Sequence, residues 1–155
     1  MGGGIAATTP VLGGTGTILG NVRVLPGGEL SPGQSIGTLS IQGDVNLGGA
    51  LFIELDGSGG GISDVLQVEG MLDLSGSSLR LAVLTELDDE AYVFVKYGIL
   101  KGGPFGKVLN LPDGYYLDYQ YHGLNQIALV IPEPPLTKLL AVALLVFWGA
   151  AKRRY

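Results

Sequence analysis

Apolar and polar residues alternate in short bursts through the first 131 positions. The alternating apolar positions are Val22/Val24, Leu39/Ile41, Val45/Leu47, Leu51/Ile53/Leu55, Leu66/Val68, Leu72/Leu74 and Leu79/Leu81/Val83. A period of two, interrupted by Gly or Asp, is typical of half-buried strands. No window before residue 132 sustains the i, i+3, i+4, i+7 spacing of an amphipathic helix. The pattern predicts an all-β region over residues 1–131.

Part of this region repeats itself. Residues 43–55 (GDVNLGGALFIEL) align with residues 70–81 (GMLDLSGSSLRL) at an offset of 27 residues, from position 45 to position 72. The aligned pairs are Val45 with Leu72, Leu47 with Leu74, Gly49 with Gly76 and, after one residue of slack, Leu51 with Leu79. A single rung cannot bury its own inward face, so repeats of this length stack into a solenoid with a shared apolar column. The repeat predicts a parallel β-helix, and an antiparallel sandwich of the same composition is the alternative.

Residues 92–131 follow a different pattern. Strands are predicted at residues 92–97, 107–109, 114–121 and 126–131. The last two flank His122-Gly-Leu-Asn125, a turn in which Gly and Asn tolerate positive φ. We therefore expect the solenoid to be capped by antiparallel strands from about residue 92, which hides the edge that an open stack exposes.

The last 24 residues predict a membrane segment. Pro132-Glu133-Pro134-Pro135 can enter neither a helix interior nor a sheet ladder. Residues 139–151 (LLAVALLVFWGAA) are apolar on every face, and a helix over residues 135–151 would be about 25 Å long, just under the ~30 Å hydrocarbon core. The basic cluster Lys152, Arg153 and Arg154 follows, and such clusters stay cytoplasmic. The expected topology is a single-pass inner-membrane anchor with residues 1–131 outside and the C-terminus cytoplasmic. A buried C-terminal helix of a soluble domain is the alternative.

Charge and glycine content divide the chain at the same point. Residues 1–131 carry thirteen Asp and Glu against five Lys and Arg, a net charge of −8, whereas residues 132–155 have a net charge of +3. Of the 27 glycines, only Gly149 follows residue 131. We therefore expect two parts, a β-solenoid passenger at 1–131 and a tail at 132–155. A passenger this acidic does not neutralise phosphates, so nucleic acid is not an expected partner.

The tail resembles a known sorting signal. Pro132-Glu133-Pro134, a short hydrophobic helix and the terminal Lys152-Arg153-Arg154 cluster resemble the PEP-CTERM signal of Gram-negative bacteria. In that family an exosortase, a membrane peptidase, recognises the tail and processes proteins bound for the cell envelope or the extracellular matrix. The resemblance implies an exosortase-like peptidase and the inner membrane as partners, with the mature protein either retained on the envelope or released.

A second resemblance concerns the passenger. Residues 27–39 (GGELSPGQSIGTL) resemble the rung corner of autotransporter-associated β-strand repeats, whose members form right-handed parallel β-helices and often carry a PEP-CTERM tail. The resemblance implies a right-handed parallel β-helix.

Two acidic segments are candidates for a functional site. The Asp56–Asp64 segment looks like a calcium loop, but Gly60 and Gln67 stand where an EF-hand needs oxygen ligands. We expect a loop between rungs, with Asp64 bonding to backbone amides where the next strand starts. Asp88-Asp89-Glu90 is expected to be a solvated turn. The chain has no Cys and one His, so no metal site, cofactor or cysteine nucleophile is predicted.

Three tyrosines near the end of the passenger are candidate glycan contacts: Tyr116, Tyr119 and Tyr121. On a continuous strand, Tyr119 and Tyr121 share one face with Leu117, while Tyr116, Asp118, Gln120 and His122 share the other. A tyrosine beside polar groups can stack on a sugar ring, although tyrosines are also ordinary strand formers.

The sequence thus predicts a non-enzymatic, exported structural or adhesive protein of the envelope or extracellular matrix. A carbohydrate-binding surface module, with exopolysaccharide as partner, is the alternative. The sequence shows no pair of acidic residues on stacked rungs, so nothing in it points to an enzyme. Residues 1–10 (MGGGIAATTP) contain neither a basic segment nor an apolar run, so we expect further rungs and a signal peptide to be encoded upstream.

Overall fold

The computed structural model describes residues 8–134. The predicted membrane helix at 135–151 and the basic cluster at 152–154 lie outside the described residues. Within residues 8–134 no helix is long and apolar enough to cross a membrane. The helical element found there is a single 3-10 turn, η1 (Tyr121–Gly123).

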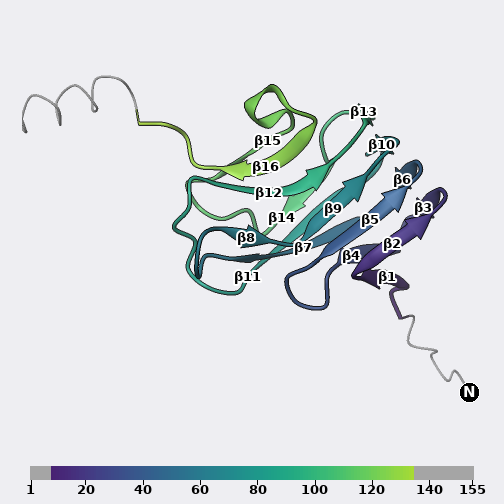
Figure 1. The fold of residues 1–155 in the computed structure, drawn as a ribbon, viewed down its shortest axis with the longest axis horizontal. Helices are drawn as coiled ribbons and strands as arrows, with labels where there is room; N and C mark the ends of the chain where they lie inside the picture. The colour runs from purple at the N-terminus through teal and green to yellow at the C-terminus, as the bar shows by residue number, and fades with distance from the viewer. Residues whose placement is uncertain (1–7, 135–155) are drawn as a thin grey trace, which may run out of the picture.

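The strands form three sheets, which we call A, B and C (Figure 1). Sheet A contains β1 (Val11–Gly14), β4 (Glu29–Pro32), β7 (Ala50–Asp56), β11 (Ser78–Val83) and β14 (Lys107–Leu109), in that order, with β8 (Ile62–Ser63) beside β7. Sheet B contains β2 (Gly16–Leu19), β5 (Thr38–Gln42), β9 (Val65–Val68), β12 (Ala91–Lys96), β16 (Gln126–Val130) and β15 (Tyr116–Asp118). Sheet C contains β3 (Val22–Val24), β6 (Val45–Leu47), β10 (Met71–Asp73) and β13 (Ile99–Lys101).

Apart from the short β8, which lies antiparallel beside β7, successive strands of each coil belong to different sheets, and the corresponding strands of adjacent coils lie parallel. The chain passes from sheet A to B to C and then returns to A, so that β1–β2–β3 form one coil and β4–β5–β6 the next. Leu72 lies opposite Val45, and Leu79 lies opposite Leu51, as the sequence repeat predicted. This parallel pairing confirms a β-solenoid and excludes the antiparallel sandwich.

The apolar column runs inside the three sheets. Of the alternating residues predicted to face inward, all are buried except Val83, which is 46% exposed. The prediction for Val83 is wrong: Val83 is the last residue of β11, at the edge of the column, and only Leu79 and Leu81 of this strand are buried in it. Along the rest of the column, inward residues of successive coils stack on one another, which removes them from water.

Close stacking at the corner between sheets B and C depends on glycine. The Gly70 N–H donates to the Gly43 carbonyl at 3.1 Å, and Gly98 N–H donates to the Gly70 carbonyl at 3.0 Å. A Cβ on Gly70 would lie 2.7 Å from the Gly43 oxygen, so a larger residue would push the coils apart. Beside this column, the Asp44 carboxylate accepts the Met71 N–H at 2.8 Å and so joins two coils.

The C-terminal end of sheet B is antiparallel. Strand β12 pairs in parallel with β9 on one side and antiparallel with β16 on the other, and β15 pairs antiparallel with β16. The predicted strand at 114–121 is shorter than expected, because β15 ends at Asp118. In the turn that follows, His122 and Gly123 take positive φ, whereas Asn125 does not. The hairpin β15–β16 (green in Figure 1) extends sheet B beyond the last coil.

Candidate functional site

A groove of about 850 Å³ opens beside the hairpin, and we call it the cap groove. Its lining residues are Glu90, Tyr116, Asp118, Tyr121, His122, Val130, Ile131, Pro132, Glu133 and Pro134. The groove therefore unites two of the three candidate tyrosines with all three residues of the predicted sorting motif.

Strand pairing explains how these residues meet. Tyr116 on β15 lies opposite Val130 on β16, which places Tyr116 at the point where the chain leaves the sheet. The Ile131 N–H then donates to the Glu90 carbonyl at 2.9 Å and holds the start of the outgoing segment against β12. Residues 131–134 are exposed and have no regular secondary structure. The motif is thus presented as an accessible segment that forms one wall of the groove.

Tyr121 reaches the cap groove because the strand ends early. On a continuous strand Tyr116 and Tyr121 would face opposite sides, but the chain turns after Asp118, whose carboxylate accepts the Gln120 N–H at 2.9 Å. The Tyr121 and His122 rings then pack together, with centroids 4.0 Å apart and planes tilted by 40°. His122 has a φ of 57°, in the left-handed region, so the extended conformation of the strand does not continue through this residue.

Tyr119 serves the packing of the cap instead. Its hydroxyl accepts the Phe105 N–H at 3.0 Å, and its carbonyl accepts the Tyr97 hydroxyl at 2.6 Å. Its ring lies 6.0 Å from the Phe105 ring. Burial raises the pKa of the Tyr119 hydroxyl above its usual range. The structure therefore separates Tyr119 from the other two candidate tyrosines.

The cap groove combines aromatic surface with hydrogen-bond acceptors. Tyr116 is 44% exposed and offers ring surface, while Asp118, Glu90 and Glu133 contribute carboxylates to the same lining. Such carboxylates can accept hydrogen bonds from hydroxyl groups, and aromatic faces can stack on sugar rings. Within residues 8–134 no three acidic or histidine side chains are placed to hold a metal ion.

Sequence reasoning missed the proximity between the sorting motif and the tyrosines. Pro132 and Tyr116 are sixteen positions apart, and only the antiparallel register of β15 with β16 brings them together. The available signal was the predicted hairpin itself, because its two outer ends must meet. The basic residues Lys152, Arg153 and Arg154 lie outside the described residues, so their relation to the groove is untested.

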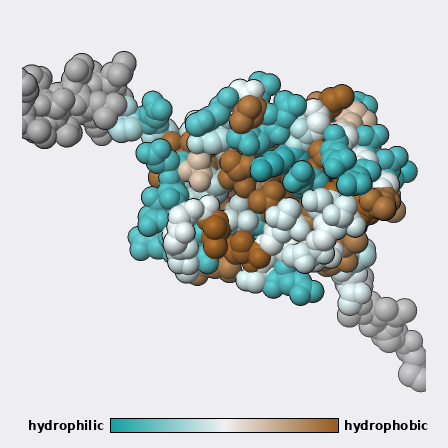
Figure 2. All heavy atoms as spheres, viewed as in Figure 1, coloured by the Kyte–Doolittle hydropathy of each residue, from teal (hydrophilic) through white to brown (hydrophobic). Residues whose placement is uncertain are grey.

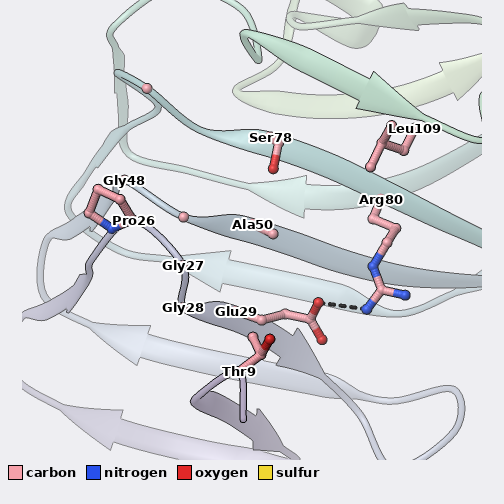
Figure 3. Close-up of a pocket in the computed structure, with 12 residues that line it drawn as sticks. Thr9, Pro26, Gly27, Gly28, Glu29, Gly48, Ala50, Ser78, Arg80 and Leu109 are labelled. Carbon is pink, nitrogen blue, oxygen red and sulfur yellow. Dashed lines mark hydrogen bonds and ion pairs between the residues drawn. The ribbon is translucent and has the colours of Figure 1, made fainter. Parts of the chain in front are cut away.

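A second, smaller groove of about 420 Å³ crosses the outer face of sheet A (Figure 3). Arg80 and Glu29 point toward each other across it, with Arg80 Nη2 2.6 Å from Glu29 Oε2. The Arg80 guanidinium also lies 4.2 Å from the centre of the Phe52 ring. Because its charge is already paired and its face already stacked, Arg80 joins β4, β7 and β11 and is not a free cation for a ligand. The sequence pattern did not reveal this contact.

The two acidic segments behave differently from each other. The Asp64 side chain is buried and accepts the Gly37 N–H at 3.0 Å and the Glu54 N–H at 2.8 Å, which confirms the predicted structural role. Burial raises the pKa of Asp64 to about 6, opposing the effect of these two hydrogen bonds. In the other segment Asp88 and Glu90 are exposed as expected, but Asp89 is half-buried and its Oδ2 atom has no hydrogen-bond partner within residues 8–134.

Comparisons of the chain with protein-family models, with curated proteins and with solved structures find no match.

Proposed function

We propose that this chain is an exported, non-enzymatic structural or adhesive protein of the cell envelope or extracellular matrix, sorted through its C-terminal tail by an exosortase-like membrane peptidase. The observation that carries the proposal is the presentation of Pro132, Glu133 and Pro134. They leave the last strand of the solenoid as an exposed segment without secondary structure. A peptidase requires such a segment, because a residue held in a sheet ladder is not free to enter an active site.

In this proposal the two parts of the chain have different roles. The solenoid is the passenger outside the membrane, and residues 135–151 with Lys152–Arg154 form the inner-membrane anchor whose basic end stays in the cytoplasm. We include in the proposal the right-handed winding that the autotransporter-associated repeat implies. Right-handed crossover is the strong preference of parallel β-connections in general.

Processing in cells tests this proposal. In a Gram-negative host with an exosortase-like peptidase, Glu133→Ala and Pro134→Ala should leave the full-length chain uncleaved in the membrane fraction, because both change the presented segment. Asp113→Ala, an exposed carboxylate outside the motif, is the matched control and should be processed normally. Replacing Lys152, Arg153 and Arg154 with Glu should weaken or invert insertion. Equal processing of all variants would overturn the proposal.

A second candidate function is a carbohydrate-binding surface module. The observation that favours it is the gathering of Tyr116, Tyr121 and His122 with the Asp118 and Glu90 carboxylates along one groove. Such a module would hold an exopolysaccharide by ring stacking and by hydrogen bonds to its hydroxyl groups.

Binding to a glycan array separates the two candidates. Tyr116→Ala and Tyr121→Ala should abolish binding, whereas Leu124→Ala, a 57% exposed residue outside the groove lining, should not change it. Tyr119→Ala is a poor test, since it removes the acceptor of the Phe105 N–H and disturbs the cap itself. Binding that survives both tyrosine changes rules out this site, and turnover of a bound polysaccharide would indicate an enzyme.

A further inference from the structure

An aspartate is followed directly by a glycine at two places in the sequence, Asp56-Gly57 and Asp113-Gly114. At such a pair the backbone can rearrange without an enzyme, because the glycine nitrogen can attack the side-chain carboxyl carbon of the aspartate and close a succinimide ring. Glycine favours the attack, since it has no Cβ to shield its nitrogen and its backbone reaches conformations that other residues avoid. The two pairs have different surroundings, so the fold determines which of them can react.

Both reacting groups of the Asp56-Gly57 pair are held by hydrogen bonds. The Gly57 N–H donates to Thr85 Oγ1 at 2.8 Å. Asp56 Oδ1 accepts the Ser58 N–H at 2.8 Å and also the Thr85 hydroxyl. Gly57 is buried, and a Cβ at this position would overlap the Glu86 carbonyl oxygen. Attack at this pair would therefore require these hydrogen bonds to open and the backbone to move away from a neighbouring segment.

The protection of Asp56 does not come from exclusion of water. The Ser58–Gly60 segment that follows it is exposed, and Figure 2 shows hydrophilic residues (teal) along the edge of the molecule where the connections beside β7 and β11 lie in Figure 1. The hydrogen bonds from Thr85 and Ser58 also lower the pKa of the Asp56 carboxyl. Because the attack requires the neutral carboxyl, whose hydroxyl leaves as water, a lowered pKa disfavours it further.

The Asp113-Gly114 pair lies in an exposed turn between β14 and β15. The Tyr115 N–H donates to the Pro112 carbonyl at 3.2 Å, and Gly114 has a φ of 83°, so the aspartate and the glycine are the two central residues of a tight turn. Within residues 8–134 neither the Gly114 N–H nor the Asp113 carboxylate has a hydrogen-bond or ion-pair partner. A Cβ on Gly114 would meet no atom within 4 Å, so no neighbouring atom restrains the backbone from that side.

We propose that Asp113-Gly114 is a site of spontaneous backbone modification, at which aspartate converts to isoaspartate, and that the fold protects Asp56-Gly57 from the same reaction. The Gly114 nitrogen forms a bond to Asp113 Cγ, the amide proton and the carboxyl hydroxyl leave together as water, and a succinimide results. Water then adds to one of the two ring carbonyls and returns a proton to the nitrogen. Addition at Cγ restores aspartate. Addition at the main-chain carbonyl breaks its bond to Gly114, so that the backbone continues through the Asp113 Cβ and Cγ.

The product has the same mass as the original chain, but its backbone is longer by one methylene group. The insertion falls between β14, which ends at Leu109, and β15, which begins at Tyr116, so it changes no residue of a paired strand. It lies next to Tyr115, whose hydroxyl donates to the Asp89 carbonyl at 3.0 Å and whose ring centre is 6.1 Å from that of Tyr92. The modification therefore alters the cap beside these contacts and leaves the strand pairing in place.

The two pairs can be compared within one sample. The full-length chain in detergent is kept in mildly acidic buffer made with water that carries a heavy oxygen isotope, and portions are digested over time. Trypsin places the pairs in different peptides, because Arg80 and Lys107 lie between them. The Asp113 peptide should gain the isotope and isoaspartate, measured by mass spectrometry with electron-transfer fragmentation, at least about tenfold faster than the Asp56 peptide, whose hydrogen bonds must open first. A portion digested at the start corrects for reaction during digestion.

Unfolding the chain in urea removes the difference in surroundings, so both pairs should then react at similar rates. Asp113→Glu should abolish the signal of its peptide, because the larger ring closes far more slowly, and this assigns the signal to Asp113 and not to Asp118 in the same peptide. Thr85→Val removes the acceptor of the Gly57 N–H and should speed the reaction at Asp56 several-fold, whereas Thr85→Ser keeps the hydroxyl and should not.

Four outcomes would overturn the proposal. The folded chain could show no isoaspartate at Asp113, or equal rates at Asp113 and Asp56. The difference in rate could persist in urea, which would make it a property of the local sequence and not of the fold. The rate at Asp56 could stay unchanged in Thr85→Val that far-UV circular dichroism shows to be folded, which would mean that these hydrogen bonds do not protect the pair.

Discussion

At the C-terminal end of the solenoid the hairpin β15–β16 packs against the apolar column, whereas at the N-terminal end no such hairpin lies over the column within residues 8–134. The difference is visible when one apolar residue of the last complete coil is compared with one of the first. Phe94 on β12 is completely buried, while Leu12 on β1 is 40% exposed. A parallel coil cannot close its own end, because each strand always offers one further edge. At the C-terminal end sheet B changes to antiparallel pairing, although β13, β14 and β15 still have no strand partner on their outer sides within residues 8–134.

Tyrosine makes this closure possible. All seven tyrosines of the chain lie at or after position 92. The Tyr97 hydroxyl donates to the Tyr119 carbonyl at 2.6 Å, and the Tyr115 hydroxyl donates to the Asp89 carbonyl at 3.0 Å. Their rings cover the column while their hydroxyl groups satisfy the backbone of the irregular segments above it. The coil β1–β3 contains no tyrosine, and within residues 8–134 its outer backbone edges have no strand partner.

The largest expected effect on the free energy of unfolding comes from truncating an apolar side chain near each end of the column. Phe94→Ala removes a fully buried ring and should lower the free energy of unfolding by about 3–5 kcal/mol. Leu12→Ala removes a side chain that is already 40% exposed and should cost about 1 kcal/mol. Urea denaturation followed by far-UV circular dichroism measures both values. Equal losses would show that the N-terminal end is as well covered as the C-terminal end.

A smaller effect distinguishes two tyrosines within the cap. Tyr119→Phe leaves the Phe105 N–H without its acceptor and should cost about 1–2 kcal/mol of unfolding free energy. Tyr116→Phe changes an exposed hydroxyl and should alter stability by no more than about 0.5 kcal/mol. Thermal unfolding of the two variants under one set of conditions provides the comparison. If Tyr116→Phe proved the more damaging change, the assignment of Tyr119 to packing and Tyr116 to the groove would be reversed.

A further expected effect concerns the middle of the solenoid and depends on pH. The folded-state pKa of Asp64 is raised to about 6 from an ordinary value of 3.8, so the native state holds a proton that the unfolded chain releases between these values. The stabilisation from this proton is complete below about pH 4 and is lost as the pH rises through 6. Between pH 5 and pH 7 the wild-type chain should therefore lose stability. Asp64→Asn should flatten this slope, and an unchanged slope would exclude Asp64 as its source.

The sequence predicted the elements better than their ends. Alternation located the inward residues because every coil buries the same face, and the match of Val45 with Leu72 gave the correct register. Only one pair of coils was recognisable as a repeat, since the corner glycines Gly20, Gly43, Gly70 and Gly98 are separated by 23, 27 and 28 residues. Val83 is exposed at the end of β11, and local alternation contains no information about where the buried part of a strand ends.

The sequence predicted which residues belong to the candidate site, but it did not predict how they are arranged. Tyr116, Tyr119 and Tyr121 were all identified as candidates, but Tyr121 was placed on one face with Tyr119 and away from Tyr116, on the assumption that the strand continues to Tyr121. The turn after Asp118 depends on the positive φ of His122 and on a hydrogen bond from Gln120, neither of which alternation signals. Pro132 and Tyr116 line the same groove because of the hairpin register, which local alternation does not reveal.

The unequal spacing of the corner glycines has a consequence for how such a chain can change. The additional residues of the coil between Gly43 and Gly70 are accommodated partly in the exposed segment at Ser58, Gly59 and Gly60, outside the column. Insertions and deletions there alter the length of the gene without shifting the register of any strand. One residue added within β10 would instead turn Leu72 outward. The Ser58–Gly60 segment is therefore the place where mutation can lengthen the protein and where a foreign peptide can be displayed. The strands of the neighbouring coils keep their register in both cases.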